Sequence, residues 1–286
     1  MPPSIEVTRE LLADWPLPTG GESKYDRGQV VVVGGSRRSP GAAILSGVSS
    51  LRVGAGRLTL AVAESVSTSV AVALPECGVV GLGESRDGHI RGDSLDDAAR
   101  DLGAADAVLV GPGLADRDHT SELVRAAGTV MPDEATLILD AFALSAVADD
   151  QHLLRDFGGS LVMTPNQHEA ELLLAHPLTS DGSDAREIAA RYGAVVTLSN
   201  TIAEPSGTTW VVREGNSGLG TSGSGDVLAG AIAGLCARGA SPQQATVWAT
   251  WAHHAAGDRL AARVGPVGYL PTEVANELPR CLDTFS

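Results

Sequence analysis

Residues 29–63 read QVVVVGGSRRSPGAAILSGVSSLRVGAGRLTLAVA, and this stretch decides the fold class. Its first part, QVVVVGGS, is a valine run of strand length that ends in glycines, as expected for a strand buried on both faces. PGAAILSGVSSLRVGAG then carries apolar residues at helical spacing and stops at glycines. RLTLAVA, which begins at Arg57, is a second strand. A strand, a helix and another strand in this order predict neighbouring parallel strands.

Four further runs have the same character and occupy residues 106–114, 136–144, 160–165 and 194–199. Each is apolar almost throughout and is followed by a polar or glycine turn. Such runs, alternating with helical patterns, predict an α/β fold with a mostly parallel central sheet and helices on both faces. The chain contains no linker, repeat or low-complexity stretch, so we expect a single domain over residues 1–286.

The composition excludes several classes of partner. The net charge is −15, and an acidic field repels nucleic acid and anionic lipid. Aromatic residues make up only 3% of the chain, which argues against a stacking surface for single-stranded nucleic acid. Lys24 is the only lysine. A phosphate group would therefore be held by arginines, backbone N–H groups, a metal ion or that one lysine.

The sequence also bears on the compartment. The first residues, MPPSIEVTRELLADW, are acidic and polar, unlike a signal peptide. No apolar run reaches membrane-spanning length, so we expect no membrane partner. Cys77, Cys236 and Cys281 lie far apart and match no metal spacing, which indicates reduced thiols. We expect a cytoplasmic protein.

Ligands of open parallel sheets bind outside the carboxyl ends of the strands. Glycines follow the first strand at residues 34–35, and Gly-Pro-Gly follows another at residues 111–113. Asp140 lies inside TLILDAFAL, and Asn166 and Glu169 follow SLVMTP. Each of these features is also common as a plain turn or helix cap. Their shared position after strands predicts the ligand site at this edge of the sheet.

The strongest signal is GNSGLGTSGSGDVLAGAIAGL, residues 215–235. Gly223 and Gly225 permit backbone conformations closed to other residues, so their N–H groups and that of Ser224 can converge on an anion. The helix that starts near Asp226 adds its positive N-terminal end. Asp226 is then either a carboxylate that stabilises the helix start, or a base that takes a proton from a hydroxyl attacking a bound phosphate. The preceding Gly-Ser-Gly favours the base.

Two common nucleotide motifs are absent from the sequence. The loop is not a P-loop, because no Gly-Lys-Ser/Thr follows its glycines. GGSRRSPGA, after the first strand, lacks the G-x-G-x-x-G spacing of dinucleotide-binding folds. We therefore do not expect a Rossmann dehydrogenase.

The pattern N-x-G-x-x-T-x-G-x-G-D-V-L-A-G over residues 216–230 resembles the nucleotide and catalytic loop of the ribokinase-like superfamily. Within it, the chain is most similar to the ADP-dependent NAD(P)H-hydrate dehydratases. VGPGL, LDAFAL, MTPNQHEAELL and WATWAHHAAGD occur in that family's order, and the similarity runs from about residue 24 to about residue 276. The resemblance implies a ribokinase-like three-layer sandwich without a separate epimerase domain.

The resemblance also implies an activity. Hydrated NADH and NADPH, called NADHX and NADPHX, would lose water while ADP is consumed to AMP and phosphate. Mg²⁺ would be the cofactor. The same resemblance implies a homo-oligomer, specifically a tetramer.

Single residues acquire implied roles by position. Asp226 is the implied catalytic base, and Glu169 the implied metal ligand. The implied substrate-binding residues are Ala42, Gly113, Asn166 and Asp226. The implied nucleotide-binding residues are Thr197, Leu198, Ser199, Asn200, Thr201, Gly223, Ser224 and Gly225.

Three positions depart from the family pattern. Most dehydratases have histidine at the position of Asn166, and they often have a second acid at that of Phe142. Residues 197–201 keep only the last threonine of a Lys-Gly-x-x-Thr segment. Two alternatives therefore stay open. One is a small-molecule kinase of the same superfamily, which would release a stable phosphorylated product, and the other is a non-catalytic nucleotide-binding relative.

A helix beginning at Ser241 and Pro242 carries two adjacent histidines, His253 and His254. Adjacent side chains on a helix point about 100° apart, so the pair does not predict a metal site. Trp248, on the same helix, is assigned to core or subunit packing.

Overall fold

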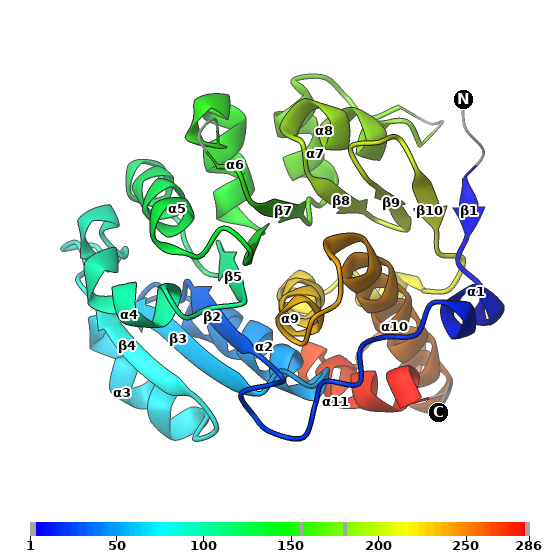
Figure 1. Ribbon diagram of the computed structural model, residues 1–286, viewed down its shortest axis with the longest axis horizontal. Coiled ribbons are helices and arrows are strands. Elements are labelled where there is room, and N and C mark those ends of the chain that lie inside the picture. Colours follow the sequence, from blue (N-terminus) through cyan, green and yellow to red (C-terminus); the bar gives the residue numbers. More distant parts are fainter. Residues whose placement is uncertain (1–3, 155–156, 180–181, 284–286) are drawn as a thin grey trace.

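A computed structural model describes residues 4–154, 157–179 and 182–283, whose strands form one ten-stranded sheet (Figure 1). The strand order is β1-β10-β9-β8-β7-β6-β5-β2-β3-β4. The strands are β1 (Ile5–Glu6), β2 (Gln29–Val33), β3 (Arg57–Ala63), β4 (Gly78–Leu82), β5 (Ala107–Val110), β6 (Thr136–Leu139), β7 (Ser160–Met163), β8 (Val195–Leu198), β9 (Thr201–Ala203) and β10 (Thr209–Val211). From β8 to β4 all neighbours in this order are parallel, whereas β9 runs antiparallel to β8 and β10.

Strand β2 shows why both faces of the sheet are covered. All five of its residues are buried. Its side chains alternate, so Val30 and Val32 enter one apolar cluster while Val31 and Val33 enter the other. A sheet that is apolar on both faces needs a helical layer on each. The predicted α/β fold with a mostly parallel sheet is confirmed.

The helices form the two outer layers (Figure 1). One layer contains α1 (Arg9–Asp14), α2 (Pro40–Arg52), α3 (Glu64–Ala73), α9 (Ser224–Ala237), α10 (Pro242–Arg263) and α11 (Pro271–Leu282). The other contains α4 (Ala99–Leu102), α5 (Arg117–Val130), α6 (Phe142–Asp149), α7 (Gln167–Leu174) and α8 (Asp184–Tyr192). Short 3₁₀ helices are η1 (Gly92–Ala98), η2 (Gln151–Leu154) and η3 (Ser217–Leu219). Within the described ranges no helix is both long and apolar enough to cross a membrane.

Helices α2 and α9 approach so closely that their contact requires glycine. A Cβ atom on Gly230 of α9 would lie 2.1 Å from the carbonyl oxygen of Ser46 on α2. One turn further on, a Cβ on Gly234 would lie 2.5 Å from the carbonyl oxygen of Ser50. At the start of α9, Gly223 adjoins Leu45. The contact therefore fixes the start of α9 beside the first turns of α2.

Helix α10 begins with the predicted cap, since Ser241 Oγ accepts a hydrogen bond from the Gln244 N–H at 3.2 Å. Near this end the helix binds the N-terminal segment. Gln244 Nε2 donates to the carbonyl oxygens of Trp15 and Pro16, at 3.2 and 2.9 Å. Trp248 Nε1 donates to the Trp15 carbonyl at 2.9 Å. The segment at residues 15–16 is thus held against the first turns of α10.

Candidate active site

The glycine turns after β2 and β5 bind each other through their backbones. The Gly35 N–H donates to the Pro112 carbonyl at 2.8 Å, and the Ser36 N–H donates to the Gly113 carbonyl at 3.1 Å. A Cβ on Gly34 would lie 2.1 Å from the Pro112 carbonyl oxygen. The two turns therefore form one backbone-lined floor at the carboxyl ends of adjacent strands.

Two of the expected substrate-binding residues flank this floor. Ala42 is half-buried in the first turn of α2, and its N–H lies 3.4 Å from the Ser39 carbonyl oxygen. Gly113 has a φ of +72°, and a Cβ there would lie 2.4 Å from the same Ser39 oxygen. Ala42 and Gly113 thus come together around Ser39.

Asp140 directly follows β6 and is buried. Thr164, which directly follows β7, donates from its Oγ1 to Asp140 Oδ1 at 2.7 Å. Burial raises the pKa of Asp140 to about 7, and the negative charges of Asp226 and Glu169 contribute to the rise. The sequence placed Asp140 at a strand end but assigned it no role. The structure adds this carboxyl group to the candidate site.

Asn166 and Glu169 start α7 as a reciprocal cap. The Glu169 N–H donates to Asn166 Oδ1 at 3.0 Å, and the Asn166 N–H donates to Glu169 Oε2 at 2.9 Å. Burial raises the pKa of Glu169, and the charge of Asp226 adds to that effect. The cap occupies Asn166 Oδ1 and Glu169 Oε2. The atoms of these two side chains that remain available to contact a ligand are therefore Asn166 Nδ2 and Glu169 Oε1.

The start of α9 offers backbone N–H groups to an anion. Gly223 is its N-cap with a φ of +93°, and the backbone of Gly225 is exposed. Within the described part of the chain, the amides of Gly223, Gly225 and Asp226 make no backbone hydrogen bond. Free amides at a helix N-terminus attract negative charge. Burial meanwhile raises the pKa of the half-buried Asp226 carboxyl.

Ser224 differs from its neighbours in this loop. Its N–H donates to the Thr221 carbonyl at 3.1 Å, so this amide is engaged within the loop. Its side chain is buried, and Oγ lies 3.0 Å from His253 Nε2. The amides left without a backbone partner in the described structure are therefore those of the residues on either side of Ser224.

Asp140 directly follows β6, whereas Glu169 and Asp226 lie in the first turns of α7 and α9; their carboxyl groups act on one another electrostatically and are called the carboxyl cluster here. The charge of Asp226 raises the pKa of both other groups, and that of Glu169 acts on Asp140. A divalent cation would relieve this repulsion, and carboxylate oxygens suit a hard cation. In the described ranges no three His, Cys, Asp or Glu side chains already converge as a metal cluster. A cation here would therefore complete its coordination with ligand oxygens and water.

Replacing Asp140 with asparagine should stabilise the fold, and more so at high pH. Because the pKa of Asp140 is raised in the folded state, wild-type stability falls as the pH rises from about 4 to about 7. An asparagine side chain does not titrate and can still accept the Thr164 hydrogen bond. We expect Asp140→Asn to gain roughly 2–3 kcal/mol more at pH 8 than at pH 5, measured by urea unfolding. An equal effect at both pH values would contradict the burial of an uncompensated carboxyl group.

Residues 197–201, the expected nucleotide segment, form the end of β8, a turn and the start of β9. The Thr197 side chain is buried, with Oγ1 3.1 Å from Thr250 Oγ1 of α10, and Leu198 is buried too. Ser199, with a φ of +56°, and Asn200 are exposed at the turn. The turn lies at the carboxyl end of β8, the same edge as the carboxyl cluster. Of the five residues, Ser199 and Asn200 are best placed to touch a ligand.

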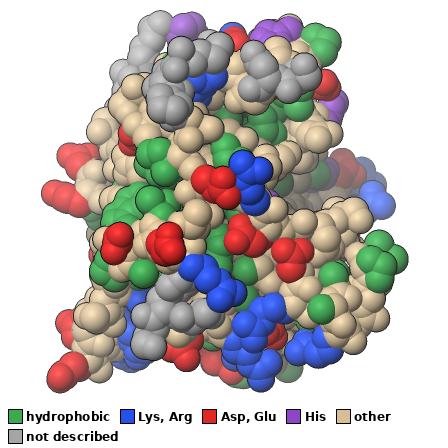
Figure 2. Space-filling view, turned by 90° about the vertical axis from the view of Figure 1, so that its right-hand side faces the viewer, with side chains coloured by type: hydrophobic (Ala, Val, Ile, Leu, Met, Phe, Trp, Pro, Cys, Tyr) green, Lys and Arg blue, Asp and Glu red, His purple; other side chains and the backbone are tan. Residues whose placement is uncertain are grey.

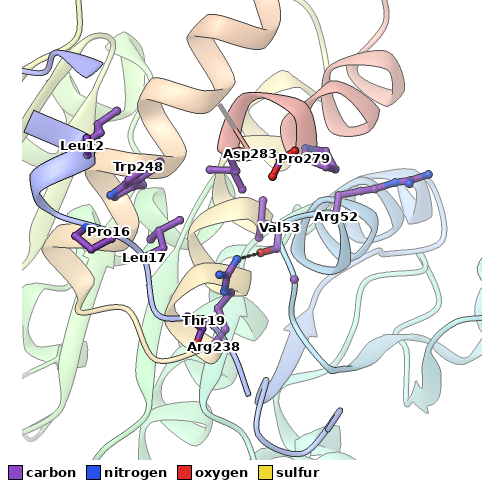
Figure 3. Close-up of a pocket in the computed structure, with 13 residues that line it drawn as sticks. Leu12, Pro16, Leu17, Thr19, Arg52, Val53, Arg238, Trp248, Pro279 and Asp283 are labelled. Atoms are coloured by element: carbon purple, nitrogen blue, oxygen red, sulfur yellow. Dashed lines mark hydrogen bonds between the residues drawn. The ribbon is translucent and has the colours of Figure 1, made fainter. Parts of the chain in front are cut away.

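Two cavities lie away from this edge, one where α2 and α9 end and the other between the end of α2, the end of α10 and α11. The first, of about 460 Å³, is drawn in Figure 3, where Arg238 Nη1 donates to the Val53 carbonyl at 2.7 Å. The second, of about 430 Å³, is lined by three arginines and two glutamates, namely Arg52, Arg263, Arg280, Glu273 and Glu277. Figure 2 shows basic side chains along the lower rim of the molecule's α10 side, below a band of acidic ones. Neither cavity is lined by a carboxyl group of the candidate site.

A family model described as NAD(P)H-hydrate dehydratase matches residues 30–280. The chain belongs to the NAD(P)H-hydrate dehydratase family. It is 42% identical over 285 residues to an ADP-dependent (S)-NAD(P)H-hydrate dehydratase of Xanthomonas campestris, covering 97% of this chain and 96% of that one. The expected resemblance to this dehydratase family is confirmed.

Solved structures agree with this membership. An ADP/ATP-dependent NAD(P)H-hydrate dehydratase of Bacillus subtilis, co-crystallised with ATP and Mg²⁺, superposes with a TM-score of 0.83 at 27% identity and covers 100% of both chains. A ribokinase-like superfamily protein of Enterococcus faecalis gives a TM-score of 0.82 at 25% identity, over 99% of this chain and 96% of that one. The ribokinase-like fold is confirmed.

The family also includes longer proteins. The chain matches bifunctional NAD(P)H-hydrate repair enzymes and spans about half their length, for example 49% of the one from Moorella thermoacetica, at 35% identity over 89% of this chain. This chain is thus similar over nearly the whole length of one relative and over about half the length of others.

Proposed function

We propose that this dehydratase converts NADHX and NADPHX back to NADH and NADPH while ADP is consumed to AMP and phosphate. The observation that carries the proposal is the Asp226 carboxyl group beside the free amides at the start of α9. The same residues would bind a phosphoryl group and deprotonate the hydroxyl that attacks it. The Xanthomonas relative, 42% identical over nearly the whole chain, carries the name of this reaction.

The chemistry solves a leaving-group problem. Hydroxide leaves carbon poorly, whereas phosphate leaves well. The substrate hydroxyl oxygen attacks the terminal phosphorus of ADP, its proton passes to Asp226, and the bond to AMP breaks. The carbon–oxygen bond then breaks and releases phosphate, and loss of a ring proton restores the dihydronicotinamide. NADHX and ADP thus give NADH, AMP and phosphate.

Backbone groups at the start of α9 stabilise the charge that develops on the transferred phosphoryl group. The amides of Gly225 and Asp226 belong to the first turn of a 14-residue helix, and the positive end of that helix adds to their effect. Ala42 and Gly113 would hold the hydrated cofactor over the backbone floor, with Asn166 contributing its side-chain amide. Ser199 and Asn200, with their neighbours in residues 197–201, would contact the nucleotide.

Glu169 would hold Mg²⁺, with Asp140 and Asp226 nearby. Mg²⁺ usually binds such sites through one or two carboxylates plus phosphate oxygens. When bound, it would neutralise negative charge on the ADP phosphates. The three carboxyl groups repel one another, and the described residues do not already form a complete set of metal ligands. Both observations fit that mode of binding.

We propose one catalytic domain over residues 1–286, since a single sheet takes its strands from Ile5 to Val211. We propose the cytoplasm as its compartment, because all three cysteines are free thiols in the structure. A homo-oligomer, as a tetramer, is the proposed assembly.

The test is to mix hydrated NADH, Mg²⁺ and the purified protein with ADP, with ATP, or without nucleotide. We expect dihydronicotinamide absorbance to return only with nucleotide, and with ADP to yield AMP and free phosphate in equal amounts. A stable phosphorylated product without free phosphate would instead identify a kinase. Nucleotide binding without any turnover would identify a non-catalytic relative.

A further inference from the structure

His253 of α10 lies directly behind the start of α9. Its Nε2 atom is 3.1 Å from the carbonyl oxygen of Ser224 and 3.0 Å from Ser224 Oγ. His253 is 5% exposed, and its Nδ1 is buried without a hydrogen-bond partner among the described residues. No sequence motif separates this histidine from an ordinary core residue, because the contact joins positions 29 residues apart.

The chemistry of the contact defines the imidazole tautomer. A carbonyl oxygen can only accept a hydrogen bond, and a proton on Nδ1 would be buried without an acceptor among the described residues, so we assign the ring proton to Nε2. Nδ1 is then the bare nitrogen, which agrees with its lack of a partner among the described residues. Burial, aided by neighbouring His254, lowers the pKa of His253 to about 3, so the ring is neutral near pH 7. His253 is therefore a fixed, uncharged donor.

The accepting carbonyl belongs to the same peptide unit as the Gly225 N–H. In a trans peptide unit the C=O and N–H are coplanar and point in opposite directions. A hydrogen bond from His253 to the Ser224 carbonyl therefore fixes the direction of the Gly225 N–H. It also polarises that amide, because donation to the carbonyl oxygen makes the N–H a stronger donor.

We propose that His253 is a positioning residue that orients and polarises the Gly225 amide for the transferred phosphoryl group. Gly225 is exposed, its N–H has no backbone partner in the described structure, and no described atom beyond its own helix and chain neighbours lies within 4 Å of its Cβ position, so this amide is open to a ligand. The kinetic part of the proposal rests on the proposed dehydratase function. His253 itself touches no reacting atom.

Helix α10 also binds the beginning of the loop that runs from Gly215 to the start of α9. Asp258 accepts from the Gly215 N–H at 2.8 Å and from Asn216 Nδ2 at 2.9 Å. His253 and Asp258 thus hold the loop at its two ends from one rigid helix. A donor on such a scaffold stays aligned while charge develops on the ligand, which is the requirement for transition-state stabilisation.

The experiment compares His253→Ala and His253→Gln with the wild-type enzyme. Deleting one donor to an oxyanion typically costs 10²–10³-fold in kcat, so misaligning one should cost about 10-fold. We expect His253→Ala to lose about that much kcat while KM for ADP stays nearly unchanged. His253→Gln, whose side-chain NH₂ can donate to the same carbonyl, should recover part of the loss.

Thr246→Val is the matched control. Thr246 is equally buried on α10, and its Oγ1 donates to the Pro242 carbonyl at 2.7 Å, away from the loop. This variant should lose stability but keep the wild-type kcat. Wild-type kcat in His253→Ala would overturn the proposal. So would equal loss in the alanine and glutamine variants, because that result would indicate packing alone.

A second readout does not need catalysis. The ¹⁵N spectrum of the histidine rings at pH 7, assigned by comparison with His253→Gln, should show His253 protonated on Nε2. Adding ADP should shift the Gly225 amide resonance in the wild type and shift it less in His253→Ala, or in His253→Gln should the alanine variant not fold. An Nδ1-protonated ring, or equal shifts in wild type and variant, would overturn the inference. These spectra test the hydrogen bond itself, so their outcome holds even where the assay disproves the dehydration reaction.

Discussion

Replacing Asp226 with asparagine is expected to lower the dehydration rate by about 10³-fold, the middle of the range for loss of a general base. Asparagine keeps the size of the side chain and leaves the amides at the start of α9 in place. It cannot take up the proton of the attacking hydroxyl. The affinity for ADP should therefore stay nearly unchanged. Absorbance recovery gives kcat, and titration calorimetry gives the dissociation constant.

The matched control is Glu10→Gln. Like Asp226, Glu10 is an acidic residue in the first turn of a helix, in this case α1. The Glu10→Gln variant should keep wild-type turnover. Wild-type turnover in Asp226→Asn would show that Asp226 serves only to stabilise the start of α9. Removing the Asp226 charge should also lower the pKa of Asp140, which ¹³C NMR of its carboxyl carbon can follow.

Replacing Gly230 with alanine is expected to destabilise the fold by about 3 kcal/mol, at the upper end of the usual cost of overpacking. The added Cβ would lie 2.1 Å from a backbone oxygen, that of Ser46, and 2.2 Å from Ser49 Oγ. A side chain can rotate away, but the backbone of α2 is fixed by its own helix. The melting temperature should fall by roughly 5 °C in scanning calorimetry.

Gly41→Ala is the control for this substitution. Gly41 also lies in a helix, α2, but apart from its own helix and chain neighbours no described atom is within 4 Å of its Cβ position. Alanine there should be neutral or stabilise by roughly 0.5 kcal/mol, since helical glycine carries an entropic cost. Equal melting temperatures for Gly230→Ala and the wild type would mean that α2 and α9 can separate without cost.

The central strands were predictable because burial on both faces leaves a continuous apolar run. The valines of β2 and the residues of β5, β6 and β7 follow that rule. The edge of the sheet was less predictable. Strand β1 has two residues and β9 has three, and each exists because a neighbouring strand supplies its hydrogen bonds. So short a segment carries no periodicity of its own.

The candidate site divides in the same way. Gly113, Asp140 and Asn166 follow parallel neighbouring strands, so their meeting at one edge could be inferred once the strands were recognised. The inward orientation of Ser224 and its contact with His253 could not, because they depend on how α9 packs against α10. The nucleotide-binding role expected for residues 197–201 stays a prediction. Within this segment, Ser199 and Asn200 are the two exposed residues and so the best candidates for contact.

Helix α10 holds distant parts of the chain at its two ends. Its first turns bind the carbonyls of Trp15 and Pro16, and Asp258 near its other end binds Gly215 and Asn216. Because both segments are bonded to one helix, we expect residues 15–16 and 215–216 to exchange their amide hydrogens as one cooperative unit. We therefore expect a proteolytic cut near Trp15 to loosen the segment at Gly215 and Asn216 as well, although α10, with 22 residues, is about 33 Å long.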